Sequence, residues 1–132
     1  MNRYITLFIP IFITVIAVIG LAGSPECSFI TKSDLRNYCR HDCGLISNSD
    51  LRSMCRGDCS LISDSDTRHL CRHNCGFIKD SDLRHMCKGD CGFIKDSDLR
   101  AYCNHNCSFI TKSDLRHLCR AGVKFPGKAF LH

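Results

Sequence analysis

Residues 75–87 read CGFIKDSDLRHMC, and versions of this stretch make up most of the chain. Its two cysteines recur with alternating gaps of 12 and 4 residues, which gives a period of 16 residues and six copies over residues 27–119. A unit this small cannot bury its own apolar face, so neighbouring units must complete the core. The cysteines are Cys27, Cys39, Cys43, Cys55, Cys59, Cys71, Cys75, Cys87, Cys91, Cys103, Cys107 and Cys119.

The second half of each unit has the pattern of a short helix. Leu83, Met86 and Cys87 are spaced i, i+3 and i+4, which is one face of a helix. Asp80 or Ser81 can cap its start, and Gly89 suits a left-handed stop. Every three-residue link between units ends in Asp or Asn, which predicts a second N-cap before each first cysteine.

These signals predict an all-α fold of small disulfide-stapled helical hairpins with a 16-residue period, stacked as a short α-solenoid. At the usual spacing of packed helices, about 8–10 Å, six units would form a rod or gentle superhelix about 50–60 Å long.

The cysteine density is typical of small exported domains. In an antiparallel hairpin the first cysteine of a unit lies near its second, and pairing across the links instead would leave Cys27 and Cys119 without partners. Spacing alone leaves many connectivities open. We predict the pairs 27–39, 43–55, 59–71, 75–87, 91–103 and 107–119.

The N-terminal region reads as a secretory signal. Arg3 precedes an apolar run over residues 4–21, which ends in small residues. This predicts a signal peptide over residues 1–22, cleaved after Ala22, and a secreted or periplasmic protein. The alternative is an uncleaved anchor formed by residues 4–21, because a run of that length is almost enough to span a bilayer.

Charge excludes one class of partner. The net charge of the chain is +5, and the 17 basic and 13 acidic residues after the leader leave +4. Basic and acidic residues alternate inside every unit, so no block of like charge offers a footprint for nucleic acid. We expect no nucleic-acid partner, and membrane contact only through an uncleaved leader.

Histidines in three links allow a metal-binding interpretation. His41, His73 and His105 each lie between two cysteines at a spacing acceptable for zinc. The other two links carry Gly57 and Gly89 while keeping their cysteines, and an exported chain usually oxidises such cysteines. We therefore predict no metal site and no cofactor. We expect His69, His85 and His117, at a variable helix position, to be surface residues.

Two further motifs have a structural and a functional interpretation. Arg56-Gly57-Asp58 is the tripeptide of integrin ligands, but the five links together describe an ordinary helix stop followed by a cap. The recurring Ser-Asp-Leu-Arg element could display a ridge of Asp–Arg pairs to a partner. We favour the structural interpretation, in which the element provides solvated caps and surface ion pairs worth about 0–1 kcal/mol each.

Catalytic machinery is not recognisable. The sequence has no glycine-rich phosphate loop, no His-Glu-x-x-His, and no nucleophile that occurs once beside a base that occurs once. We therefore expect the chain not to be an enzyme.

The core Ile-x-Asp-Ser-Asp-Leu-Arg-x-x-Cys at 78–87 and 94–103 resembles short cysteine-framed repeats in uncharacterised exported bacterial proteins. The resemblance covers residues 27–119. It implies an exported repeat framework and no activity, so no functional residues carry over.

The tail after Cys119, residues 120–132, leaves the repeat and mixes cations with Phe125 and Phe130. A disordered end is the first expectation for it, and a cap on the last unit is the second.

The leading functional hypothesis is an exported disulfide-rich repeat scaffold that binds a protein or polyanionic partner through one face. The alternatives are a cationic disulfide-rich effector or antimicrobial protein acting on membranes, and a metal-binding Cys/His repeat protein.

Overall fold

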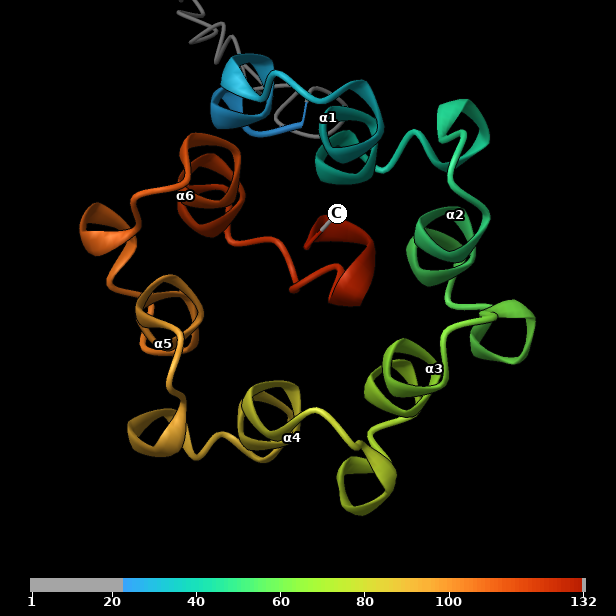
Figure 1. Ribbon diagram of the computed structural model, residues 1–132. Coiled ribbons are helices and arrows are strands. Elements are labelled where there is room, and N and C mark those ends of the chain that lie inside the picture. Colours follow the sequence, from blue (N-terminus) through green and yellow to red (C-terminus); the bar gives the residue numbers. More distant parts are fainter. Residues whose placement is uncertain (1–22, 132) are drawn as a thin grey trace, which may run out of the picture.

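The computed structural model describes residues 23–131, and within that range the regular structure is entirely helical (Figure 1). Each unit is a short 3-10 helix followed by a two-turn α-helix. The all-α fold and the 16-residue period are therefore confirmed, while the predicted leader, residues 1–22, lies outside the described residues. The α-helices are α1 (Ser33–Arg40), α2 (Ser49–Arg56), α3 (Ser65–Cys71), α4 (Ser81–Lys88), α5 (Ser97–Cys103) and α6 (Ser113–Arg120). The 3-10 helices are η1 (Pro25–Phe29), η2 (Cys43–Leu45), η3 (Cys59–Leu61), η4 (Cys75–Phe77), η5 (Cys91–Phe93), η6 (Cys107–Phe109) and, in the tail, η7 (Gly127–Phe130).

The inner α-helices begin at side-chain caps. Asn48, Asp64, Asp80 and Asp96 each accept a hydrogen bond from the backbone amide three residues ahead, at 2.8–2.9 Å. These bonds satisfy amides that have no partner inside the helix, and they confirm Asp80 as a cap. In α1 and α6 a lysine occupies the cap position and its side chain makes no such bond.

The helices end at a left-handed residue in the link, as predicted. His41, Gly57, His73, Gly89 and His105 have φ between +58° and +77°. The prediction of a second side-chain cap was wrong. A 3-10 helix does begin after each final link residue, but the backbone carbonyl of Asp42, not its carboxylate, accepts the Leu45 amide at 3.0 Å. Because that carbonyl already satisfies the Leu45 amide, which is the amide a side-chain cap would bind, the Asp42 carboxylate makes no capping bond.

Six disulfides staple each 3-10 helix to the end of the α-helix in the same unit. The pairs are Cys27–Cys39, Cys43–Cys55, Cys59–Cys71, Cys75–Cys87, Cys91–Cys103 and Cys107–Cys119, which is the predicted pairing. Their Cα atoms are 5.5–5.6 Å apart, within the ordinary range for a disulfide. Among the described residues no cysteine is free.

The core of each unit is built from two repeated apolar positions. One is the isoleucine that follows the 3-10 helix, 1% exposed in all six units. The other is the leucine of Ser-Asp-Leu-Arg, replaced by Thr67 in the third unit and buried everywhere. The isoleucines are Ile30, Ile46, Ile62, Ile78, Ile94 and Ile110.

Consecutive units are joined by the aspartate of Ser-Asp-Leu-Arg. The Asp82 carboxylate accepts the backbone amides of Lys95 and Asp96 in the next unit, both at 2.9 Å. Asp34, Asp50, Asp66 and Asp98 bind the corresponding amides of their own neighbours. This joint fixes how each unit is rotated relative to the one before it.

The same joint closes the chain into a ring. The carboxylate of Asp114, in the last unit, accepts the amides of Thr31 and Lys32, in the first unit, at 2.8 and 3.1 Å. Helix α6 packs against η1, and Figure 1 shows six α-helices viewed nearly end-on around a centre. The predicted open rod is therefore wrong, because each joint turns the chain by about one sixth of a circle and the sixth unit meets the first.

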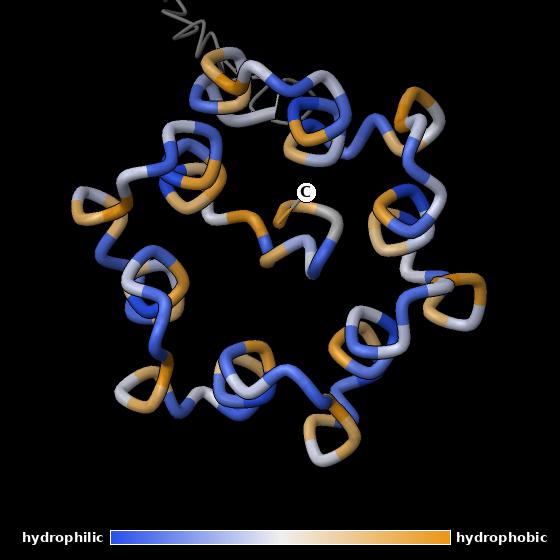
Figure 2. Tube along the Cα trace, viewed as in Figure 1, coloured by the Kyte–Doolittle hydropathy of each residue, from blue (hydrophilic) through white to orange (hydrophobic). Residues whose placement is uncertain are grey.

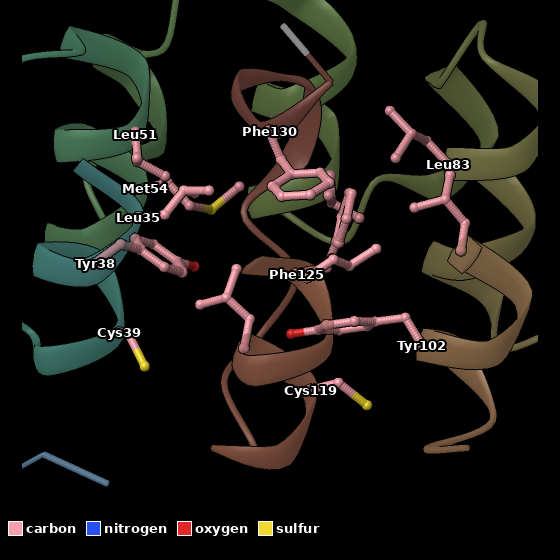
Figure 3. Close-up of a cluster of buried hydrophobic side chains, with 14 of the residues drawn as sticks. Leu35, Tyr38, Cys39, Leu51, Met54, Leu83, Tyr102, Cys119, Phe125 and Phe130 are labelled. Carbon is pink, nitrogen blue, oxygen red and sulfur yellow. The ribbon is translucent and has the colours of Figure 1, made fainter. Parts of the chain in front are cut away.

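The C-terminal tail enters the ring and occupies part of its interior. The hydroxyl groups of Tyr38 and Tyr102 donate to the backbone carbonyls of Lys124 and Val123. Figure 3 shows these two tyrosines reaching toward Phe125 from opposite sides, and Phe125 and Phe130 are buried. Burial raises the pKa of Tyr38 to about 12, so its hydroxyl remains a donor at neutral pH. The expectation of a disordered end was wrong, because a closed ring needs apolar side chains in its interior.

Candidate functional site

The residue before each core isoleucine is large, apolar and exposed. Its side chain is 63–75% exposed in all six units, while the isoleucine beside it is 1% exposed. In Figure 2 these apolar 3-10 helices form the outer corners of the ring. We call this set the rim, and it consists of Phe29, Leu45, Leu61, Phe77, Phe93 and Phe109.

The local structure holds the rim side chains outward. The disulfide fixes a cysteine of each 3-10 helix two residues before the rim residue, and the isoleucine after that helix is anchored inward. Its backbone carbonyl accepts a hydrogen bond from the arginine of Ser-Asp-Leu-Arg, for example Arg84 Nη1 to the Ile78 carbonyl at 2.9 Å. A Cβ added at Gly76 or Gly92 would meet nothing within 4 Å, so the surface beside Phe77 and Phe93 is open.

Three of the four rim phenylalanines rest on histidines of the preceding helix. His69 stacks on Phe77, His85 on Phe93, and His117 on Phe29 across the ring closure, each with ring centroids 5.4 Å apart. The expectation that these histidines are plain surface residues was wrong. They are half-buried under the aromatic rings, which hold one face of each ring in place.

Two of these histidines have a ring nitrogen without a hydrogen bond. The Nδ1 atoms of His69 and His85 are buried and have no hydrogen-bond partner among the described residues, and His85 Nδ1 lies 4.0 Å from Asp90 Oδ2. In the third, Nδ1 of His117 lies 2.8 Å from Glu26 Oε2, which adds a contact to the ring closure. In the other units the same position holds Asn37, Ser53 or Ala101.

The Ser-Asp-Leu-Arg charges are used inside the framework. The aspartates bind amides of the next unit, and the arginines bind carbonyls of their own unit. Burial alone would raise the pKa of the Asp82 carboxyl, but the amides of Lys95 and Asp96 hold that pKa below its usual range. The ridge of Asp–Arg pairs considered as a binding surface therefore does not form.

The links form turns and contain no metal cluster. Gly57 has a φ of +76°, so Arg56-Gly57-Asp58 is one variant of the helix stop shared by all five links. All 12 cysteines are in disulfides, which leaves none of them as a thiolate ligand for His41, His73 or His105. Within residues 23–131 no three His, Cys, Asp or Glu side chains are grouped as metal ligands.

Comparison with protein-family models, curated proteins and solved structures finds no match. The resemblance to exported bacterial repeats therefore stays a prediction. In the part of the chain that the structure describes, every helix is too short or too polar to cross a bilayer.

Sequence reasoning missed the rim because it did not distinguish Phe77 and its equivalents from the core isoleucine that follows each of them. The signal was present in the pattern Cys-(Ser/Gly)-(Phe/Leu)-Ile. Two large apolar residues in a row on a 3-10 turn point in different directions, so only one can face the interior. The isoleucine, which never varies, is the core residue, and the position that alternates between Phe and Leu is exposed.

Proposed function

We propose that this chain is an exported, disulfide-stapled ring that binds a protein partner through its rim. The observation that supports the proposal is the exposure of six large apolar side chains in equivalent positions. The framework does not need them, because the isoleucines, leucines and tail supply the core. Large apolar side chains that are held outward in every unit, beyond those the core uses, support an interaction surface. Six disulfides indicate an oxidising compartment, which supports export.

The rim suits recognition of a protein. Aromatic side chains are enriched among residues that dominate binding energy, and the rings of Phe77 and Phe93 are already held by His69 and His85. Little side-chain entropy is then lost when a partner covers them. Six equivalent sites on one rigid ring also raise the effective concentration of each site once another is occupied.

Other partner classes fit the ring less well. A polyanion needs a face of one charge, but cations at the links are interleaved with acids, as in Arg56 with Asp58 and Lys88 with Asp90. A flat bilayer laid against the edge of the ring meets only neighbouring rim residues, because the 3-10 helices are distributed around the perimeter (Figure 2).

A photo-crosslinking experiment tests the proposal. A benzophenone amino acid replaces Phe77, Phe93 or Phe109 in the exported protein of the producing cells, and Lys95 serves as the exposed control position. We expect the same protein adduct from all three rim positions and none from the control. Absence of a rim-specific protein adduct would overturn the proposal.

Binding of the captured protein in purified form then tests the energetics. Phe77→Ser combined with Phe93→Ser should weaken binding at least about tenfold, since each buried ring contributes roughly 1.5–3 kcal/mol. Phe77→Leu with Phe93→Leu should retain most binding, because Leu occupies the rim in two units. The matched control is Lys79→Ser with Lys95→Ser, which places at this position the residue that Ser47 and Ser63 supply elsewhere.

A vesicle assay separates the membrane alternative. Dye release from vesicles of phosphatidylcholine and phosphatidylglycerol by low micromolar oxidised protein, abolished by the rim Ser variants, would replace this proposal with a membrane-acting effector. We expect no release.

A further inference from the structure

The tail leaves one sector of the ring interior unfilled. Beside α4 a cavity of about 450 Å³ lies between the tail and helices α3 to α5. We call it the lumen pocket, and its apolar walls include Leu70, Met86, Tyr102, Val123 and Phe125. Its size falls within the range of small-molecule sites, about 300–1,000 Å³.

The pocket follows from where the tail runs. The residue before the second cysteine points into the ring in every unit, and five of the six are covered. Tyr38, Met54, Leu70, Tyr102 and Leu118 are buried, but Met86 is only half-buried. The tail is tied to α3 through Thr67 and Asp66 and to α1 and α5 through the two tyrosines, so no tail residue covers α4.

One lysine and two histidines lie at one edge of the pocket. Lys124 Nζ is 3.4 Å from His73 Nε2, and both residues line the cavity together with His105. Among the described residues Lys124 has no carboxylate within 4 Å, whereas Lys128 in the same tail is paired with Asp66 at 2.8 Å. A lysine whose only polar side-chain partner is a histidine can accept an anion without giving up an ion pair.

We propose that the lumen pocket binds a small amphiphile with an apolar body and one anionic head group. The apolar body lies against Met86, Tyr102 and Phe125, where it covers surface that the tail leaves exposed. The head group accepts charge-assisted hydrogen bonds from Lys124 and meets the imidazoles of His73 and His105. This site is separate from the rim and does not depend on a protein partner.

Methyl resonances of the two methionines after the leader provide the test. Met86 lines the pocket, while Met54 is buried outside it and reports on the fold as a whole. Oxidised protein labelled with ¹³C-methyl methionine is titrated with decanoate below its micelle concentration. We expect the Met86 methyl signal to shift with saturation while the Met54 signal stays in place.

Matched probes and variants identify the head-group contact. Decyltrimethylammonium, with the same chain and the opposite charge, should bind at least about tenfold more weakly than decanoate. Lys124→Gln should weaken decanoate binding about tenfold, since a hydrogen bond to a charged group is worth roughly 1.5–3 kcal/mol. Lys79→Gln removes an exposed lysine that does not line the pocket and should leave decanoate binding unchanged.

Each contrary result overturns a named part of the proposal. No shift of Met86 with either probe means that the pocket is not a binding site. Equal binding of both probes, or of decanoate to the Lys124→Gln variant, removes the anionic head group from the proposal. Should Lys124→Gln change the Met54 signal or the melting temperature, Val123→Phe serves as the second variant. It puts a larger side chain on the pocket wall, keeps the Met86 reporter and should weaken decanoate binding at least about tenfold.

Discussion

At the scale of single residues, the departures from the repeat explain more than the repeat itself. Thr67 is the one place where Ser-Asp-Leu-Arg loses its leucine, and it lies where the tail approaches α3. A Cβ added at Gly127 would lie 2.6 Å from Thr67 Cγ2, and Thr67 Oγ1 accepts the Lys128 amide at 3.1 Å. Beside it, Lys128 Nζ is 2.8 Å from the Asp66 carboxylate. The third unit is thus adapted to receive the tail.

Restoring the leucine should therefore destabilise the protein. Thr67→Leu places a larger side chain against the Gly127 backbone and removes the acceptor of the Lys128 amide, so we expect a loss of about 1–3 kcal/mol in the free energy of unfolding. Thr67→Val keeps the branched shape and loses only the hydroxyl, so it should cost less. Chemical unfolding of the wild type and of the two variants ranks their free energies of unfolding. A Thr67→Leu protein as stable as the wild type would contradict this account of the tail.

The aspartate joints predict loss of stability in acid. Burial raises the pKa of Asp66, but Lys128 and the amides of Lys79 and Asp80 lower that pKa to about 2. The pKa values of the equivalent carboxyls in other units are also lowered. A carboxyl with a lowered folded pKa contributes stability that is full above its unfolded value, near 3.8, and is lost as the pH falls through the folded value.

Guanidinium unfolding followed by circular dichroism at several pH values checks this. The midpoint should be steady from about pH 7 to about pH 5 and fall between about pH 4 and about pH 2. Asp98→Asn should lower the midpoint at neutral pH and flatten the acid decline, because it removes one titrating joint. An unfolding midpoint that is the same at about pH 4 and about pH 2 would show that the joints do not titrate.

At the scale of elements, each unit consists of two short helices that would not be stable alone and that a disulfide joins. An α-helix of seven or eight residues is marginal in water, and a disulfide that closes a 13-residue loop contributes about 3 kcal/mol in the chain-entropy model. The left-handed link residue then turns the chain outward toward the next 3-10 helix. His41, His73 and His105 adopt this conformation at a cost that Gly57 and Gly89 avoid.

Gly89 and Gly92 are three residues apart, and replacing each with alanine should change the stability of the protein differently. Gly89 has a φ of +77°, so Gly89→Ala should lower the free energy of unfolding by about 1 kcal/mol. Gly92 lies in open space without a positive φ, and three other units carry Ser there, so Gly92→Ala should be neutral within about 0.5 kcal/mol. Thermal unfolding of the two variants side by side measures the difference. Equal effects would mean that the link conformation is not what Gly89 supplies.

At the scale of the whole molecule, the important property is closure. A linear repeat protein has two ends, each with an unsatisfied interface, and usually needs special capping units. Here the interface between the last and the first unit is built from the same contacts as the interfaces between consecutive units. Asp114 binds Thr31 and Lys32 as Asp98 binds Thr111 and Lys112, with closely similar distances. The tail then completes the core from inside.

Amide hydrogen exchange distinguishes the ring from an open solenoid. In the ring the amides of Thr31 and Lys32 are hydrogen-bonded to Asp114 and should be protected to the same degree as those of Thr111 and Lys112. Asp114→Ala should speed the exchange of the Thr31 and Lys32 amides only. Asp98→Ala should speed the exchange of the Thr111 and Lys112 amides only. Fast exchange of Thr31 and Lys32 in the wild-type protein, with slow exchange of Thr111 and Lys112, would show an open chain.

The sequence by itself determined the local framework of the 16-residue unit. The cysteine spacing, the i, i+3, i+4 pattern ending at Cys87, the cap at Asp80 and the stop at Gly89 are local signals, so the short helices and the disulfide pairing could be predicted from them. The tertiary structure decided what depends on the rotation between units, since no single copy encodes it. That rotation turns the predicted rod into a ring, draws the tail into its centre beside Thr67, and leaves Phe77 and its equivalents on the outside. Each joint turns the chain by about one sixth of a circle, and six equivalent joints together decide whether the ends meet.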